Sequence, residues 1–297
     1  MTESTRTKAK FFGALLLLLL FLSRSTLLLE ATRAALRLTA TTILPSLFPY
    51  LVLSGILSAA AVGLSLPGGR LFSRLFRLPA PGLLALLLGS LCGFPVGVAV
   101  TAELCKCGAI SREEAARTAA LSANTGPAFA VAAVGGAMFG DTAFGWWLYG
   151  IQILLSLLFG LVAARRYPIP VSSATAVAPA PRPFTEILYH ASLSMIKIVA
   201  AVVFFGSLAA LPGRLLSPSA AAAVASLLEV GNGTGLAAAL PPKIGRPIAA
   251  FALSFSGLSV LMQSAALLEP LGVEVRPLAL RKLLQGGTAA FLAVLFL

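Results

Sequence analysis

The chain has 297 residues, of which 58% are hydrophobic and 11% are charged. A soluble domain of this length carries about a quarter charged residues, so the composition excludes a soluble enzyme or binding module and predicts an all-α polytopic membrane protein. The net charge of +12 does not indicate nucleic-acid binding, because Lys and Arg collect in the short cytoplasmic loops of membrane proteins.

The first predicted element belongs to residues 1–40. "RTKAK" followed by "FFGALLLLLLFL" is similar to a signal peptide, but no small-x-small cleavage site follows directly. We therefore expect an uncleaved N-terminal transmembrane helix over about 10–29 and a loop after it. A second apolar segment covers about 41–64, and a basic amphipathic loop comes next.

Residues 83–104 are apolar but are interrupted at their centre by "GSLCGFPVG". Each half has about ten residues, too few to span a bilayer, which favours a re-entrant hairpin. Ser111 and Glu114 have the spacing of a capping box, so a helix is expected to start there and to cover about 112–138. "LSANTGPAF" interrupts that helix, and a further spanning helix is predicted over 143–164.

Residues 165–186 are rich in Pro, Ala and Ser and predict a cytoplasmic linker, after which the same plan returns. The elements expected after the linker are a helix over about 187–211, an apolar hairpin over about 217–242 broken by "EVGNGTG", a helix over about 245–272 broken by "SFSGLS", and a last helix over 276–297.

Residues 41–164 and 187–297 are therefore predicted to be two repeats, each with a re-entrant hairpin and a broken transmembrane helix. Three crossings in each repeat would insert the second copy from the opposite face, which gives the inverted repeats of many secondary transporters. Lys and Arg are concentrated in the segments that this topology places inside, so we expect a cytoplasmic N-terminus and an outside C-terminus.

The four interruptions predict the functional site, because half-helix ends expose backbone groups and partial charges that can hold a substrate or ion near the midplane. The alternative is that small residues merely permit close helix packing. The predicted substrate-binding residues are Gly93, Phe94, Pro95, Ser122, Asn124, Thr125, Gly126, Pro127, Asn232, Thr234, Ser254, Ser256, Ser259 and Gln263.

Two acidic residues are candidates for ion or proton coupling. Glu229 lies at the tip of the second hairpin, and an intramembrane carboxylate is costly and usually functional. It is expected to bind a cation, to carry a coupling proton or to hydrogen-bond the substrate. Glu103 lies near the interface, where a solvated role is the alternative. The cysteines lack the spacing of a metal site, and neither a metal nor a cofactor is expected.

Motifs in the same order along residues 41–297 resemble the sporulation integral membrane proteins of the YlbJ type. They are "LPSLFPYLVLSGIL", "GFPVG", "SREEAARTAALSANTGPAF", "EVGNG" and "FSGLSVLMQ". That family belongs to the nucleoside-recognition (Gate) group, which includes a stage V sporulation protein implicated in dipicolinate transport.

The resemblance implies transport of a small anionic metabolite, dipicolinic acid, during endospore formation, in the cell membrane or the outer forespore membrane. Phe94 or Phe129 could then pack against the pyridine ring. The expected partners are the lipid bilayer, a small-molecule substrate and a coupling H⁺ or Na⁺, and a homo-oligomer is left open.

Two other functions fit the sequence. A transporter of a nucleoside or another small metabolite would have the same architecture, whereas a non-transporting assembly protein of the spore envelope would need no polar midplane. An enzyme is not expected, because a single His and the lack of Walker A, HExxH and GxSxG motifs leave no evident catalytic set.

Overall fold

The computed structural model describes residues 3–61, 66–169, 183–211, 213 and 216–297, and every regular element in these residues is a helix. In this part of the chain, four segments are long and apolar enough to cross a membrane, or five if the bent pair α1–α2 counts as one span. These four are Thr142–Arg166, Phe184–Ala209, Pro242–Leu271 and Arg276–Phe296. The predicted all-α membrane fold is confirmed.

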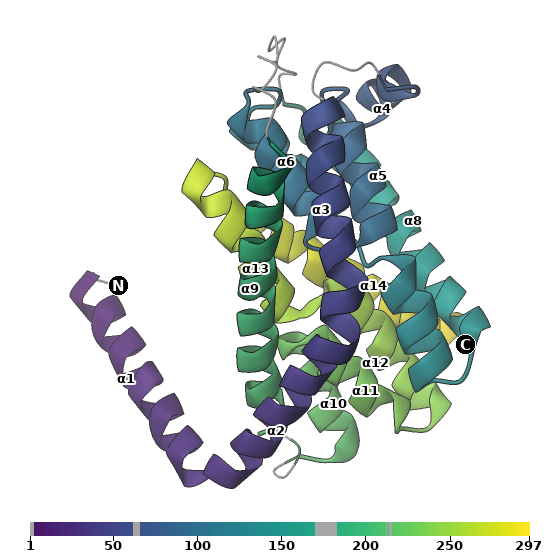
Figure 1. Ribbon diagram of the computed structural model, residues 1–297. Coiled ribbons are helices and arrows are strands. Elements are labelled where there is room, and N and C mark those ends of the chain that lie inside the picture. The colour runs from purple at the N-terminus through teal and green to yellow at the C-terminus, as the bar shows by residue number, and fades with distance from the viewer. Residues whose placement is uncertain (1–2, 62–65, 170–182, 212, 214–215) are drawn as a thin grey trace.

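The N-terminal part consists of α1 (Glu3–Ser23), α2 (Ser25–Leu38), η1 (Thr39–Ile43) and α3 (Leu44–Ala61). The helix expected over 10–29 is interrupted at Arg24, and α1 and α2 meet at an angle of 94°. Figure 1 shows α1 splayed away from the other helices, whereas α2, η1 and α3 continue along the body. The leucines of α1 are exposed, as expected for a helix that faces lipid.

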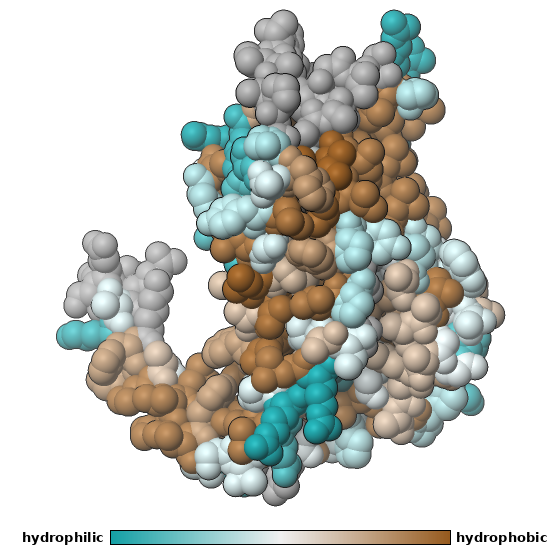
Figure 2. Space-filling model, in the orientation of Figure 1, coloured by the Kyte–Doolittle hydropathy of each residue, from teal (hydrophilic) through white to brown (hydrophobic). Residues whose placement is uncertain are grey.

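The outer face is mainly apolar where α3 and α9 (Phe184–Ala209) lie side by side. Figure 2 shows hydrophobic side chains across this face and a hydrophilic patch over α2. The exposed side chains of α2 include Arg33 and Arg37. This distribution fits a protein whose flanks contact hydrocarbon and whose helix ends reach water.

The basic loop predicted after α3 contains a short amphipathic helix, α4 (Gly69–Phe76). Phe72 and Phe76 are buried, while Arg70 and Arg74 are exposed. The next two helices, α5 (Gly82–Cys92) and α6 (Val96–Lys106), have eleven residues each, or roughly 16 Å at 1.5 Å per residue. They form the first hairpin, and neither helix alone could span the hydrocarbon core.

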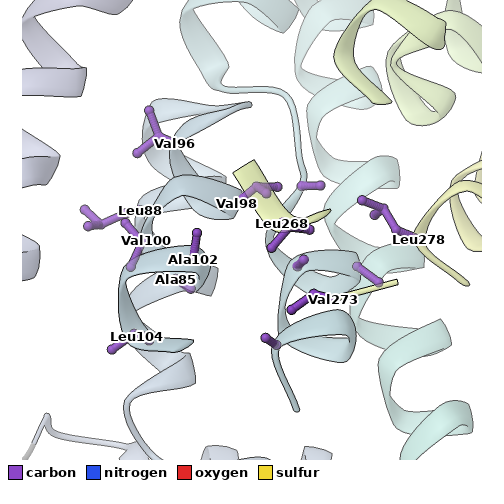
Figure 3. Packing of buried hydrophobic residues seen from close by; sticks show 14 of the residues in the cluster. Ala85, Leu88, Val96, Val98, Val100, Ala102, Leu104, Leu268, Val273 and Leu278 are labelled. Carbon is purple, nitrogen blue, oxygen red and sulfur yellow. The ribbon is translucent and has the colours of Figure 1, made fainter. Parts of the chain in front are cut away.

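The first hairpin packs into an apolar core that draws side chains from both halves of the sequence. Val98, Val100 and Ala102 of α6 pack in one cluster with Leu268 and Val273 from the C-terminal half (Figure 3). These side chains are almost completely buried. The hairpin is therefore held between the two halves of the sequence.

The first broken helix begins at α7 (Arg112–Ser122) with the predicted capping box. The Ser111 N–H donates to Glu114 Oε2 at 2.6 Å, and the Glu114 N–H donates to Ser111 Oγ at 3.2 Å. Residues 123–126 are not helical, and the π-helical segment η2 (Ala128–Met138) follows Pro127. The interruption predicted from "LSANTGPAF" is therefore present in the fold.

The next span is α8 (Thr142–Arg166). The central part of the predicted linker, 170–182, lies outside the described residues. The second half then contains α9, α10 (Pro218–Leu228), α11 (Val230–Ala238), α12 (Pro242–Phe255), α13 (Gly257–Leu268), η4 (Glu269–Leu271) and α14 (Arg276–Phe296). The breaks between these helices are short: Glu229 separates α10 from α11, and Ser256 separates α12 from α13.

Each hairpin tip packs against the broken helix of its own half through a glycine. Gly93 has φ +84°, and a Cβ there would lie 2.7 Å from the backbone nitrogen of Gly126. Gly257 has φ +79°, and a Cβ there would lie 3.2 Å from Cα of Glu229. Only glycine permits this backbone angle and this close approach without strain, so these residues bring tip and break together.

Candidate functional site

A cavity lies where the two hairpin tips and the two helix breaks meet. Its volume, counted as the space open to the centre of a water molecule, is about 70 Å³, enough for several waters. It is lined by Leu38, Ile43, Leu47, Tyr50, Leu91, Cys92, Gly93, Phe94, Thr125, Gly126, Ala128, Phe129, Ile198, Val202, Glu229, Val230, Gly231, Ser259, Val260 and Gln263. Most of this lining is apolar.

The predicted site residues divide into two groups. Seven of the sixteen line the cavity: Gly93, Phe94, Thr125, Gly126, Glu229, Ser259 and Gln263. These residues come from four separate stretches of the sequence, so the fold brings all four predicted interruptions to one place. The wall also contains residues of α2, η1, α3 and α9, and no motif in the sequence marked these elements as part of a site.

Thr125 in the cavity wall makes three hydrogen bonds to other elements. Its N–H donates to Gln152 Oε1 at 3.1 Å, and Gln152 Nε2 donates back to the Thr125 carbonyl at 2.8 Å. Its hydroxyl donates to the Leu253 carbonyl at 3.2 Å. The first break is therefore fixed both to α8 and to the end of α12, just before the second break.

Sequence reasoning missed Gln152, although it is fully buried in α8. Its amide replaces the intrahelical hydrogen bonds that Thr125 cannot make in a broken helix. Gln285 of α14 supports it from behind, with Nε2 donating to the Gln152 carbonyl at 2.7 Å. A glutamine in an otherwise apolar span was the available signal.

Glu229 is only 2% exposed and acts as the N-cap of α11. Its Oε1 accepts from the Gly231 N–H at 3.0 Å, and its Oε2 accepts from the Asn232 N–H at 2.7 Å and from Asn232 Nδ2 at 3.1 Å. The positive end of the α11 dipole stabilises the carboxylate. Because each carboxylate oxygen can accept two hydrogen bonds, Oε1 retains capacity for another donor or a cation.

Ser259 and Gln263 lie one turn apart on α13, where Gln263 Nε2 donates to Ser259 Oγ at 3.3 Å. Ser259 is in the first turn of α13, and Phe129 is in the first turn of η2. The first N–H groups of a helix have no partner within that helix. Two half-helix N-termini with partial positive charge therefore adjoin the cavity.

The other predicted substrate residues do not line the cavity. Ser122, Asn124, Thr234 and Ser256 each donate a side-chain hydrogen bond to a nearby backbone carbonyl. Among the predicted substrate residues, two have a buried side-chain oxygen without a hydrogen-bond partner, Asn124 Oδ1 in the first break and Ser254 Oγ next to the second. The residues that do not line the cavity are Pro95, Ser122, Asn124, Pro127, Asn232, Thr234, Ser254 and Ser256, and a ligand-binding role for them stays a prediction.

Glu103 lies away from this cavity. It forms an ion pair with Lys106 at 3.0 Å on the partly exposed face of α6. Both residues line a different hollow between α3, α6 and α9, of about 180 Å³, together with His190 and Lys197. A partly exposed position fits the solvated alternative for Glu103. A coupling role for Glu103 stays a prediction.

Comparison with known proteins gives one informative similarity. The chain is 28% identical over 317 aligned positions to the sporulation integral membrane protein YlbJ of Bacillus subtilis (strain 168), covering 90% of this chain and 76% of that protein. No family model matches the chain, and no solved structure matches it. Together with the apolar spanning helices, this similarity supports a multi-pass, sporulation-associated integral membrane protein of the YlbJ type.

Proposed function

We propose that this protein transports a small anionic metabolite across the membrane during sporulation, with dipicolinic acid as the candidate substrate. The observation that carries the proposal is the cavity in which both hairpin tips and both helix breaks meet. Broken helices whose ends converge on one cavity are a recurring design of substrate sites in secondary transporters.

Corresponding contacts in the two halves support an inverted repeat. In each half a glycine with positive φ permits close contact between the hairpin tip and the helix break. Gly93 contacts Gly126, and Gly257 contacts Glu229. The hydrogen bond from Thr125 to the Leu253 carbonyl then joins the two halves at the cavity. In the proposed mechanism, the substrate binds at this pseudo-symmetric junction and the halves rock around it.

Three contacts between distant segments agree with the proposed topology, which has a cytoplasmic N-terminus and an outside C-terminus. Arg246 pairs with Asp141 at 2.9 Å, and both lie in segments assigned outside. Gly272 lies against Arg112, and Arg117 donates to the Tyr167 carbonyl, in each case within the side assigned inside. The membrane would be the cell membrane or the outer forespore membrane.

The cavity offers groups that suit an aromatic dicarboxylate. The N-termini of η2 and α13 can hold carboxylate oxygens through free N–H groups and their partial charges. Thr125, Ser259 and Gln263 add side-chain hydrogen-bonding groups, while Phe94 and Phe129 give apolar surface for a flat ring.

Glu229 gives a physical reason for ion coupling. A carboxylate in the wall would repel an anionic substrate in this low-dielectric environment. A proton or a Na⁺ bound at Glu229 would remove that repulsion and would therefore accompany the substrate. The free capacity of Oε1 beside the cavity supports this role.

A nucleoside is the second candidate substrate, and one observation favours it. Among the described residues that line the cavity, none is Lys, Arg or His. A neutral solute with several hydroxyl groups and a flat base would need no such side chain, and Glu229 could accept a ribose hydroxyl.

A ligand screen with the purified protein tests the proposal. Thermal unfolding in detergent and uptake by proteoliposomes are measured with dipicolinate, with nucleosides and with Na⁺ present or absent. We expect dipicolinate to raise the midpoint of unfolding of the wild type. Ser259→Ala and Gln263→Leu should reduce that increase, because they remove polar groups from the wall.

Thr288→Val is the matched control, because Thr288 hydrogen-bonds only within α14 and does not line the cavity. It should respond to dipicolinate as the wild type does. A response to nucleosides in place of dipicolinate would transfer the proposal to the second candidate. If no tested solute is bound or moved by the wild type, the transporter proposal fails.

A further inference from the structure

Three cationic side chains gather where α7, α8 and α14 pack, outside the candidate substrate cavity. They are Arg117 of α7 and the neighbouring Arg281 and Lys282 of α14. Lys282 is only 1% exposed. Arg117 acts electrostatically on Arg281, and Arg281 acts on Lys282, so each of these neighbouring cations is disfavoured by the next.

Uncharged oxygens are the hydrogen-bond partners of this cluster. Arg281 Nη2 donates to the Ser156 carbonyl at 2.7 Å, and Lys282 Nζ donates to Gln285 Oε1 at 3.2 Å. Arg117 Nη2 donates to the Tyr167 carbonyl. Within the described residues, no ion pair shorter than 4.0 Å joins an acid to any of these cations.

Glu113 acts electrostatically on Arg117, which lies one turn away on α7. It is exposed to solvent, where its charge is screened. The desolvation of several like charges without a counter-charge is costly. Lys282 is buried whereas Arg117 and Arg281 are partly exposed, and an anion from another source would offset the repulsion within this cluster.

Two donors of the cluster are buried without any acceptor: Arg117 Nη1 and Arg281 Nε. A small hollow adjoins them, with both arginines in its wall and Phe76, Leu78 and Gly160 among its other lining residues. The space open to the centre of a water molecule is about 10 Å³, which is room for one atom of about that size.

We propose that Arg117 and Arg281 hold a small anionic group in this hollow, and that Lys282 contributes to its charge balance. The ligand is a halide ion such as chloride, or a single oxygen of a carboxylate or phosphate that reaches in from the surface. It would accept hydrogen bonds from Arg117 Nη1 and Arg281 Nε and would offset the repulsion between the cations.

This site is separate from the substrate cavity but is connected to it. Lys282 donates to Gln285, Gln285 donates to the Gln152 carbonyl, and Gln152 pairs with Thr125 in the cavity wall. An anion that stabilises the cationic cluster would therefore also stabilise the hydrogen bonds between Gln152 and Thr125 at the first helix break.

Thermal unfolding of the purified full chain in different sodium salts tests the site. Chloride, bromide, acetate and phosphate are compared, at equal ionic strength, with isethionate, whose sulfonate oxygens are weak hydrogen-bond acceptors. We expect a saturable increase of roughly 2–4 °C in the midpoint of unfolding. An increase confined to halides identifies a halide ion, and one confined to acetate and phosphate identifies an oxyanion group.

Arg281→Gln and Arg117→Gln should each lose the salt-specific increase. Arg276→Gln is the matched control, because Arg276 is exposed on the same helix, and it should keep the increase. Line broadening of the ³⁵Cl resonance by the wild type gives a second readout if a variant does not fold. If the wild type responds equally to all salts and does not broaden the resonance, the hollow holds water and the proposal is wrong.

These outcomes are independent of the proposed transport function. Ser259→Ala should keep the salt response while it weakens dipicolinate binding. Conversely, a protein that transports nothing can still show a salt response that depends on Arg117 and Arg281.

Discussion

Replacing Gly93 by Ala tests the contact that brings the first hairpin tip to the first helix break. The backbone at Gly93 has φ 84° and ψ −175°, a region that is essentially restricted to glycine and costs about 1–3 kcal/mol for other residues. The added Cβ would also lie 2.7 Å from the backbone nitrogen of Gly126. Because backbone cannot rotate away as a side chain can, overpacking adds about 1–3 kcal/mol.

Gly93→Ala is therefore expected to lower the free energy of unfolding by about 2–6 kcal/mol and to weaken ligand binding, because tip and break form adjacent parts of the cavity wall. Gly287→Ala is the control, since a Cβ at Gly287 of α14 meets nothing within 4 Å and alanine favours a helix. Denaturant titration in mixed micelles and ligand-dependent melting measure both effects. Equal stability and equal binding of Gly93→Ala and Gly287→Ala would refute the reasoning.

Three further predictions concern the proposed transport function. Glu229→Gln should fold, but its free energy of unfolding should fall by about 1.5–3 kcal/mol, because one charge-assisted N-cap hydrogen bond is lost. Concentrative uptake by proteoliposomes should disappear, and unchanged uptake would remove Glu229 from the mechanism. Thr125→Val should cost about 0.6–1.7 kcal/mol in stability, since it loses the hydrogen bond to the Leu253 carbonyl. A double-mutant cycle with Gln152→Leu should show coupling, and strict additivity would contradict a joint role of Thr125 and Gln152 in stabilising the first break. Reporter fusions after residues 80, 140, 175, 214 and 297 should read in, out, in, out and out, and a cytoplasmic C-terminus would contradict the topology.

The interruptions were predictable because each has a local chemical cause. Pro127 lacks an N–H and fits the first turn of a new helix, and Ser111 and Glu114 cap the helix before it with side chains three residues apart. Gly, Ser and Asn in an apolar segment stand out against its background. Such signals require only neighbouring residues, so the breaks and the all-α fold could be read from the sequence.

The partners of the broken segments could not be predicted in the same way. Gln152 and Thr125 are 27 residues apart, and Gln285 and Gln152 are 133 apart, so only the packed fold brings them together. The cavity wall from α3 and α9 is also unmarked in the sequence, because these helices are apolar for two reasons at once, lipid contact and cavity lining. The role of Glu229 as an N-cap was missed, since the break there is a single residue long.

The two halves fix their breaks by chemically different means, and this difference bears on coupling. The first break is held by neutral groups, the Gln152 amide and the Thr125 hydroxyl, which do not titrate between pH 4 and 10. The tip of the second hairpin is held by the carboxylate of Glu229. A proton or cation can therefore change the geometry of the second tip while the first break keeps its own. In the proposed transport cycle, the coupling ion acts on the second half, and the first half supplies the fixed wall against which it moves.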